Sequence, residues 1–428
     1  MRSTRFLAIG ATGLAAALVL AGCSAPSSSD SADQTLTVWA MNGDLSPDTI
    51  AAINAKFTEA TGAKVNVQVQ EWDDIITKVT TALSTSTPPD VVDIGNTQVP
   101  IYAANGGLMD LTSVKSDLEQ GKTWLAGLEE PATQEGKLYG VPSFAGDRAV
   151  IYNKTMWAAA GVTDVPTTYA DFTHDLDLVA AANPAADFSA FYYPGQYDFG
   201  PLGFVWDAGG EIAIAKDGVW TAGFSDAKAQ KGLQQFKEFQ NKYSISSSTT
   251  SSENDPEQSQ ILADGHASAI LGISSEIDSI KKANPQLTDA DLGTFPFPGV
   301  SGKSQPVMLG GSVWGIASKS KQSKLAIEWI KIAASPEIQA DYVFGKDGWI
   351  PNSVEAIDAA SASLPPLTAG FFQAAKISKA TPAAADWPTI EGDHSLREFF
   401  GYVASGTKSV SDAAAEFDSH VESVLNNK

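Results

Sequence analysis

The first part of the chain after position 34 alternates between two apolar patterns, and this alternation constrains the fold more than any other sequence feature. Stretches with an apolar side chain at every second residue are typical of strands, and stretches with apolar residues on one helical face are typical of helices. In order, these stretches are TLTVWAM, SPDTIAAINAKFTEATG, AKVNVQVQ, DDIITKVTTALSTS and PDVVDIG. The order strand–helix–strand–helix–strand predicts a parallel sheet with right-handed crossovers, and therefore an α/β fold class.

The length of the chain indicates more than one domain. The same alternation resumes after KLYGVPSFAGDRAVIYN and continues to the C-terminus without a repeat of fixed period. The chain has 428 residues, whereas a single hydrophobic core stops growing at about 250–300 residues. We therefore expect two domains.

The chain is strongly acidic. It carries a net charge of −22, and its first 22 residues contribute two Arg and no acid, so the remainder carries −24. Such a charge is unfavourable for binding nucleic acid and for docking on anionic lipid through basic patches. We therefore expect no nucleic-acid partner.

The only cysteine, Cys23, lies between an apolar run and a serine-rich run. A lone cysteine forms no disulfide within the chain and no cysteine-based metal site. Two arginines followed by FLAIGATGLAAALVLA have the anatomy of an export signal. The sequence LAGC resembles a bacterial lipobox, which implies cleavage before Cys23 and lipidation of its thiol. We expect a signal peptide over 1–22 and a flexible tether over 23–34, with an ordinary signal peptide or a buried thiol as the alternative.

The motifs of common catalytic sites are incomplete in this sequence. The GKS stretch lacks the upstream glycine of a phosphate-binding loop, and GGSVWG departs from the G-x-S-x-G nucleophile motif at its last position. The four histidines do not have the spacing of a zinc protease site. Acids are abundant enough that a carboxylate pair of a secreted glycan hydrolase stays open as an alternative. We expect no enzymatic activity, no cofactor and no metal.

Eight segments after position 35 resemble the extracellular solute-binding proteins of carbohydrate ABC transporters, the maltose-binding-protein-like family. They occur in the expected order and spacing over nearly the whole mature chain. The segments are VWAMNGD, FTEATGAKVNVQVQEWDDIITKVTTAL, PPDVVDIGNTQ, EGKLYGVPSFAGDRAVIYNK, FVWDAGGEI, VMLGGSVWGIASKSK, SPEIQADY and GWIPNS. The resemblance implies a periplasmic-binding-protein type II fold, in which two α/β lobes are joined by crossing hinge segments around a ligand cleft.

The resemblance also implies the organisation and the function of the chain. We expect crossings near residues 144–149, 309–315 and 351. The N-terminal lobe is expected over 35–146 plus 313–350, and the C-terminal lobe over 150–308 plus 353–428. The implied protein is a monomeric receptor, anchored to the outer face of the cell membrane through Cys23. It captures a di- or short oligosaccharide and delivers it to an ABC permease. A receptor for a non-carbohydrate solute, such as a polyol or a peptide, is the alternative.

Candidate ligand contacts follow from the chemistry of sugars. Hydroxyl groups need carboxylates, amides and arginines, and the apolar faces of sugar rings need aromatic side chains. Loops at the carboxyl ends of strands present such groups in α/β sheets. The loops after the first three strands give Asn42, Asp44, Glu71, Trp72, Asn96, Thr97 and Gln98. For Asn42 to Asp44, the alternative is that these residues only turn the chain.

The second lobe and the hinge supply further candidates. We expect contacts from Arg148 at the first crossing; Tyr197, Asp198 and Phe199 in PGQYDFG; Ser274 and Glu276 in SSEI; Gly311 and Trp314 at the second crossing; Trp349; and Trp387. For Arg148, the alternative is a structural ion pair. Trp387 is expected outside regular structure, with its ring at the rim of the cleft. Unlike Trp387, three further tryptophans are expected to be packed in the cores, namely Trp39, Trp206 and Trp329.

Overall fold

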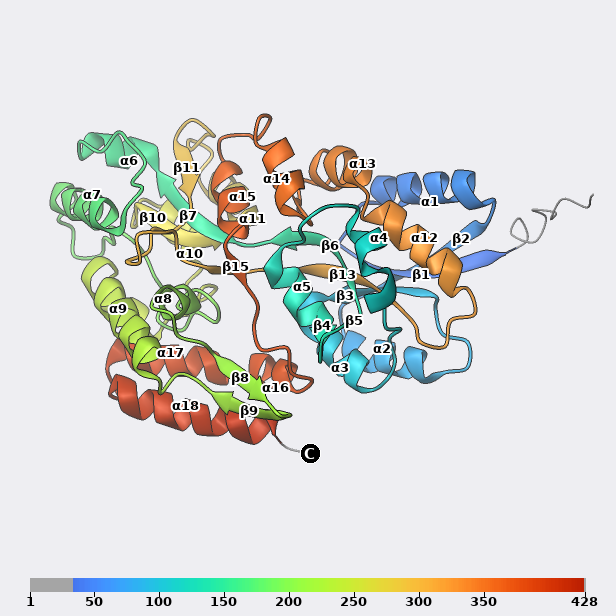
Figure 1. Ribbon diagram of the computed structural model, residues 1–428. Coiled ribbons are helices and arrows are strands. Elements are labelled where there is room, and N and C mark those ends of the chain that lie inside the picture. The colour runs from blue at the N-terminus through green and yellow to red at the C-terminus, as the bar shows by residue number, and fades with distance from the viewer. Residues whose placement is uncertain (1–33, 427–428) are drawn as a thin grey trace, which may run out of the picture.

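The alternation predicted for the start of the chain is present in the computed structural model, which describes residues 34–426 (Figure 1). Ser46 caps the first helix by accepting the Thr49 N–H, and Gly62 ends it in the left-handed conformation. The elements are β1 (Thr35–Met41), α1 (Pro47–Thr61), β2 (Lys64–Gln70), α2 (Ile75–Ser84) and β3 (Val91–Gly95). Because β1 pairs in parallel with both β2 and β3, the predicted parallel arrangement is confirmed.

Strands from later in the chain complete this first sheet. β6 (Val141–Gly146), β13 (Gly310–Ile316) and β14 (Ile350–Pro351) add to it in the order β14-β6-β13-β3-β1-β2. Each of the three runs antiparallel to its neighbours, so the complete sheet is mixed. The helices α1 and α12 (Ser323–Ala333) cover one face, and α2 and α3 (Val99–Ala104) cover the other (Figure 1).

The core of this first lobe lies between the sheet and its helices. Trp329 of α12 packs edge-on against Trp314 of β13 with ring centroids 4.8 Å apart, and both rings are buried. Burial of large rings contributes strongly to stability. The elements between β3 and β6 are η1 (Asn96–Gln98), α3, η2 (Thr112–Val114), α4 (Lys115–Glu119), α5 (Ala126–Ala132), β4 (Thr133–Gln134) and β5 (Lys137–Leu138). After α12 come α13 (Pro336–Ile338) and η4 (Gln339–Phe344).

The second lobe is built around an antiparallel sheet with the order β10-β7-β11. Its strands are β7 (Arg148–Asn153), β10 (Ala269–Ile273) and β11 (Leu292–Phe295). Aromatic rings from several helices fill its core. The other elements after β7 are α6 (Lys154–Ala159), α7 (Tyr169–Ala182), α8 (Leu202–Asp207), β8 (Ala213–Lys216), β9 (Val219–Ala222), α9 (Ala227–Tyr243), η3 (Ser246–Thr250), α10 (Gln258–Ala263), α11 (Ser275–Ala283), β12 (Val307–Met308), α14 (Val354–Ala360), α15 (Ala369–Ala375), β15 (Ser378–Lys379), α16 (Trp387–Gly392), α17 (Ser395–Ser405) and α18 (Val410–Leu425).

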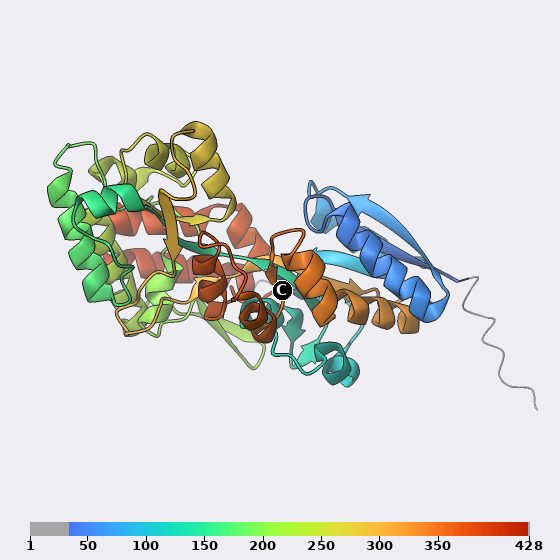
Figure 2. The same cartoon turned by 90° about the horizontal axis from the view of Figure 1, so that it is seen from above.

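The chain passes between the two sheets at three places. A single residue, Asp147, separates β6 of the first sheet from β7 of the second. The return path leads from β11 through β12 to β13, and β14 is the last strand of the first sheet before the chain goes on to α14. Seen from above, the lobes lie side by side and narrow toward these segments (Figure 2). The lobe boundaries given above stay a prediction.

None of the helices within residues 34–426 combines the length and the apolar composition that a membrane crossing requires. The predicted signal peptide, the lipid attachment at Cys23 and all of the predicted tether except Gln34 lie outside the described residues.

Candidate ligand-binding site

A cavity of about 470 Å³ lies between the two lobes and is called the interlobe cavity below. Residues that follow strands of the first sheet line one side, residues of the second lobe line the other, and the crossing segments form the wall between them. The lining residues are Asp44, Trp72, Phe144, Gly146, Asp147, Arg148, Phe199, Ile273, Ser274, Ser275, Met308, Gly310, Gly311, Ser312 and Trp349. A volume of this size suits a small organic ligand.

Asp44 provides the acidic group on the first lobe. It follows β1, and its Oδ2 accepts a hydrogen bond of 2.6 Å from the Ser312 hydroxyl of β13. The indole of Trp349 fixes the same loop by donating to the Asp44 backbone oxygen at 3.0 Å. Burial raises the pKa of the Asp44 carboxyl to about 6, although hydrogen bonds from Ser312 and Trp72 act in the opposite direction. The carboxylate is therefore a fixed acceptor for ligand hydroxyl groups near neutral pH.

Two indole rings line the cavity beside this carboxylate. Trp72, in the segment between β2 and α2, is 38 % exposed. Trp349 precedes β14 and packs against Phe144 with ring centroids 4.7 Å apart and an interplanar angle of 32°. Aromatic rings held in this way offer apolar faces that fit the C–H surface of a sugar ring.

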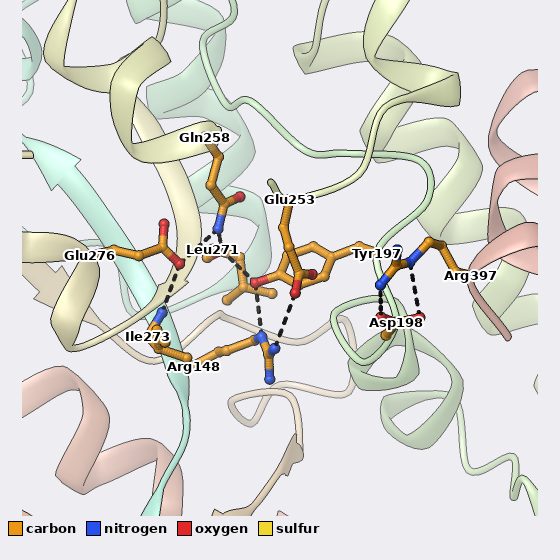
Figure 3. A network of polar contacts seen from close by, with 9 residues as sticks. All are labelled: Arg148, Tyr197, Asp198, Glu253, Gln258, Leu271, Ile273, Glu276 and Arg397. Atoms are coloured by element: carbon orange, nitrogen blue, oxygen red, sulfur yellow. Dashed lines mark hydrogen bonds and ion pairs between the residues drawn. The ribbon is translucent and has the colours of Figure 1, made fainter. Parts of the chain in front are cut away.

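Arg148 faces the cavity from the second lobe and is held by a polar network (Figure 3). Its Nε donates to the Tyr197 hydroxyl at 2.8 Å, and that hydroxyl donates to the Leu271 carbonyl at 2.9 Å. Its Nη2 lies 3.9 Å from Glu253 Oε1. The guanidinium also lies over the rings of Tyr197 and Phe199, 5.2 Å and 5.5 Å from their centroids. These contacts fix a donor group at the cavity wall.

Glu276 supports this side of the site from behind the cavity wall. Its Oε1 accepts from the Gln258 amide at 2.9 Å and from the Ile273 N–H at 3.2 Å (Figure 3). Burial raises the pKa of Glu276 to about 7, against the lowering effect of these hydrogen bonds. Because Glu276 and Tyr197 are not among the lining residues, the prediction that they face the cavity is not met in this structure.

The crossing segments contribute backbone and one buried acid to the cavity wall. Gly311 has φ +138°, and an added Cβ would lie 2.2 Å from the Phe144 carbonyl oxygen, so only glycine fits there. Asp147 is 4 % exposed, and its two carboxyl oxygens find no hydrogen-bond partner within residues 34–426. Burial raises its pKa well above the ordinary value.

The structure brings seven of the predicted residues together around the interlobe cavity. They come from both lobes and from two crossings. They are Asp44, Trp72, Arg148, Phe199, Ser274, Gly311 and Trp349. Asn42 instead lines a neighbouring groove of about 730 Å³, which shares Asp44 and Trp349 with the cavity, and its amide donates to Glu71 at 3.1 Å.

The predictions for Trp314 and Trp387 as cleft residues are wrong. Trp314 belongs to the core of the first lobe because it points from β13 toward α12. Trp387 is the first residue of α16, is 0 % exposed and donates from its indole to Glu391 at 2.7 Å. The irregular sequence before Trp387 does not indicate that a buried helix begins at this residue. Trp39 is only half-buried, contrary to expectation, and its indole donates to Gln68 at 2.9 Å.

The remaining candidates hold the structure together instead of lining the cavity. The buried Asn96 amide donates to the backbone oxygens of Gly127 and Leu309 at 3.0 Å and 2.8 Å. Asp198 pairs with Arg397 at 2.6 Å (Figure 3). Thr97 and Gln98 also lie outside the lining, and the Gln98 side chain accepts a hydrogen bond of 3.3 Å from the Tyr102 hydroxyl. Trp206 and Trp329 are buried as predicted.

Sequence reasoning missed several lining residues. They are Phe144, Gly146, Asp147, Ile273, Ser275, Met308, Gly310 and Ser312. Most of them belong to the crossing segments or lie next to a predicted residue. The predicted crossings could therefore have indicated these lining residues. Within residues 34–426, no group of three or more His, Cys, Asp or Glu side chains is arranged to hold a metal ion.

Comparison with known proteins defines the class of the chain. A profile of the family described as bacterial extracellular solute-binding protein matches residues 42–340. The diacetylchitobiose-binding protein DasA of Streptomyces coelicolor is 34 % identical over 430 residues, which cover 96 % of this chain and 96 % of the relative. The chain therefore belongs to the bacterial extracellular solute-binding protein family. The family and this relative are described as binding proteins.

Solved structures of other proteins share the fold of this chain. The sugar-binding protein MalE of Xanthomonas citri superposes with a TM-score of 0.80 at 22 % identity, over 92 % of this chain and 98 % of that one. The maltose-bound MalE of Listeria monocytogenes gives 0.76 at 18 % identity, over 93 % and 99 %. These similarities confirm the predicted two-lobed α/β fold.

Proposed function

We propose that this protein is the substrate-binding lipoprotein of an ABC transporter and captures a di- or short oligosaccharide in the interlobe cavity. The observation that carries the proposal is the set of groups that meet there. Asp44, Trp72 and Trp349 of the first lobe offer a hydroxyl acceptor and two ring faces. Arg148 and Phe199 of the second lobe offer a donor and a third ring. A ligand with many hydroxyl groups and apolar ring faces satisfies both sides.

The relatives support a sugar as the ligand. The Streptomyces relative is named for diacetylchitobiose, and the two MalE structures are those of a sugar-binding protein and a maltose complex. The ligand of this chain is accordingly a neutral saccharide that bridges the two lobes. The lobes are 35–146 plus 313–350 and 150–308 plus 353–428. Bridging favours their closure by rotation about the crossing segments.

A panel of glycans tests the function. Thermal unfolding is recorded with diacetylchitobiose, maltose, maltotetraose, a polyol and a peptide, and the incubated glycans are analysed for new reducing ends. A bound sugar at 100 times its dissociation constant stabilises the folded protein by about 2.7 kcal/mol. Stabilisation by a saccharide without products supports the receptor. New reducing ends indicate a hydrolase, and stabilisation by the polyol or the peptide alone indicates a non-carbohydrate receptor.

Membrane attachment is the second part of the proposal. The lipid on Cys23 holds a monomeric receptor at the outer face of the cell membrane, where it delivers its ligand to the permease subunits. Cys23→Ala removes the attachment point, so the protein is expected in the soluble fraction after cell fractionation. Cys23→Ala that remains with the membrane would contradict the lipid anchor.

A further inference from the structure

A groove on the first lobe adjoins the interlobe cavity and is larger than it. Its volume is about 730 Å³, compared with about 470 Å³ for the interlobe cavity. One wall comes from the first half of α1, and the other comes from β2, which is an edge strand of the first sheet. The groove is called the α1 groove below.

The two walls of the α1 groove follow from the periods of a helix and a strand. Ile50, Ala51 and Asn54 are separated by one to four positions in α1, so they lie toward one side of the helix. Val67 and Val69 are two positions apart in β2, so they share one face of the strand. Together these residues give the groove a mainly apolar surface that includes one amide side chain.

Val69 exposes an apolar side chain inside the α1 groove. It is 63 % exposed, and no other large apolar side chain within residues 34–426 is exposed to the same extent. Exposed apolar surface next to polar groups is typical of a ligand-binding groove. Because this surface adjoins the proposed sugar site, the occupant that fits it is a further part of the same ligand.

Two residues connect the α1 groove with the interlobe cavity, because Asp44 and Trp349 line both. The Trp349 indole donates to the Asp44 backbone oxygen at 3.0 Å, and the Asp44 carboxyl accepts the Ser312 hydroxyl at 2.6 Å. These bonds fix both residues at the border. A chain of sugar rings that leaves the cavity past this pair meets a ring face and a hydroxyl acceptor on its way into the groove.

The charged groups of the α1 groove suit a neutral ligand. Asp347 accepts the Ser46 N–H at 3.1 Å, and Lys346 pairs with Asp48 at 3.5 Å. Both charges therefore have partners within the protein. A carboxylate accepts several hydrogen bonds and an ammonium group donates three, so both groups can also bond to ligand hydroxyl groups.

We propose that the α1 groove extends the ligand site and holds the rings beyond the disaccharide of a neutral oligosaccharide whose first rings lie in the interlobe cavity. This inference rests on the proposed function, because the cavity is taken to bind a saccharide. It narrows the ligand to a chain of more than two rings. It also assigns the direction in which the chain leaves the cavity, past Asp44 and Trp349 and then between α1 and β2.

Calorimetric titration with saccharides of increasing length tests the inference. The probes are the N-acetylated chito-oligosaccharides and the maltodextrins, each from the disaccharide to the tetrasaccharide. In the series that the protein binds, the dissociation constant should fall about tenfold from the disaccharide to the tetrasaccharide, because the added rings cover the apolar walls of the groove. Equal dissociation constants for these two lengths would overturn the inference and leave the proposed function intact.

Two variants locate the added rings. Val69→Ser removes an exposed apolar contact, and Ala51→Leu adds a side chain that occupies part of the groove without offering a hydrogen bond. Each variant should reduce the gain from the added rings to about twofold or less, while the dissociation constant of the disaccharide stays at the parent value. Because both positions are exposed, the melting temperature should change little.

Ala55→Leu and Val165→Ser are the matched controls. Ala55 is exposed on α1 one turn after Ala51 but does not line the groove, and Val165 is 46 % exposed between α6 and α7. Both controls should keep the full gain. A gain that survives in Val69→Ser and Ala51→Leu would overturn the inference, and so would a gain that is lost in the controls as well.

Uptake of the tetrasaccharide by intact cells separates the other possible occupant of the groove. If Val69→Ser keeps the gain in affinity but impairs uptake, the groove contacts the permease and the inference is wrong. If no saccharide of either series binds the parent, the proposed function falls together with the inference.

Discussion

At the scale of single residues, the tryptophans divide by what their rings contact. Trp72 and Trp349 line the interlobe cavity, whereas Trp314, Trp329 and Trp387 are buried in the two lobe cores. Which of these two environments a tryptophan occupies depends on how its element packs against the rest of the lobe. We expect a ring in the cavity to contribute to ligand binding and a ring in a core to contribute to the stability of the fold.

Trp72→Ala and Trp387→Ala should therefore have opposite effects. Trp72→Ala removes an exposed ring face and should weaken sugar affinity by about 1–3 kcal/mol with little change in melting temperature. Trp387→Ala leaves a cavity in the second lobe and should cost about 3–5 kcal/mol of stability. Calorimetry and thermal melts of both variants measure these values. Unchanged affinity in Trp72→Ala would remove this ring from the site.

Asp147 should give the protein a stability component that depends on pH. Its pKa in the folded protein lies above the unfolded value of about 3.9, so the stabilising protonated form is fully present below that value and is lost as pH rises toward the folded pKa. The Asp147→Asn side chain stays neutral at every pH. The free energy of unfolding of this variant should therefore equal that of the parent near pH 4 and exceed it by about 1–3 kcal/mol near pH 7.

Asp110 provides the control of opposite sign. Hydrogen bonds from Thr112 lower its pKa, so its contribution is present above the unfolded value and is lost as pH falls. Asp110→Asn should therefore be no more stable to unfolding than the parent at neutral pH. Thermal melts across this pH range compare the two variants, and an Asp147→Asn advantage that is the same at pH 4 and pH 7 would contradict the account.

At the scale of elements, the strand β13 contributes both to the core of the first lobe and to the wall of the interlobe cavity. Its Trp314 end packs in the core of the first lobe, and its Gly310 to Ser312 end forms the cavity wall. The strand also pairs with both β3 and β6, so the wall is held by hydrogen bonds on two sides.

Two adjacent glycines of β13 provide a matched pair of variants. An added Cβ at Gly311 meets the Phe144 oxygen at 2.2 Å, whereas at Gly310 the nearest atom lies at 3.7 Å. Gly311→Ala should therefore lower the melting temperature and the sugar affinity together, because the Phe144 strand must shift. Gly310→Ala should retain the parent melting temperature. Equal melting temperatures for the two variants would mean that this contact does not constrain the wall.

The sequence predicted the elements of the first sheet better than their pairing. The strands β1, β2 and β3 follow from apolar periodicity, and α1 follows from Ser46 and Gly62. The addition of β13 between β3 and β6 depends on residues more than 150 positions apart, which local patterns do not report. Asp44 and Trp72 were predictable because they follow strands, whereas the burial of Trp387 depends on the packing of α16.

At the scale of the whole molecule, the two lobes present complementary groups to one cavity. The acceptor Asp44 follows β1 of the first sheet, and the donor Arg148 begins β7 of the second sheet. At the first crossing, the single residue Asp147 separates β6 from β7. A ligand that bonds to both sides couples its binding to the relative position of the lobes. The central claim is therefore that binding depends on the groups of this cavity.

Calorimetric titration of Arg148→Met against Arg397→Met tests that claim most directly. Both variants remove a guanidinium that pairs with a carboxylate in the second lobe, but Arg148 alone of the two lines the cavity. The account predicts that Arg148→Met weakens binding of the sugar selected from the panel by about 10- to 100-fold, and that Arg397→Met stays within about threefold of the parent. Equal affinities for the two variants, with both folded, would contradict it.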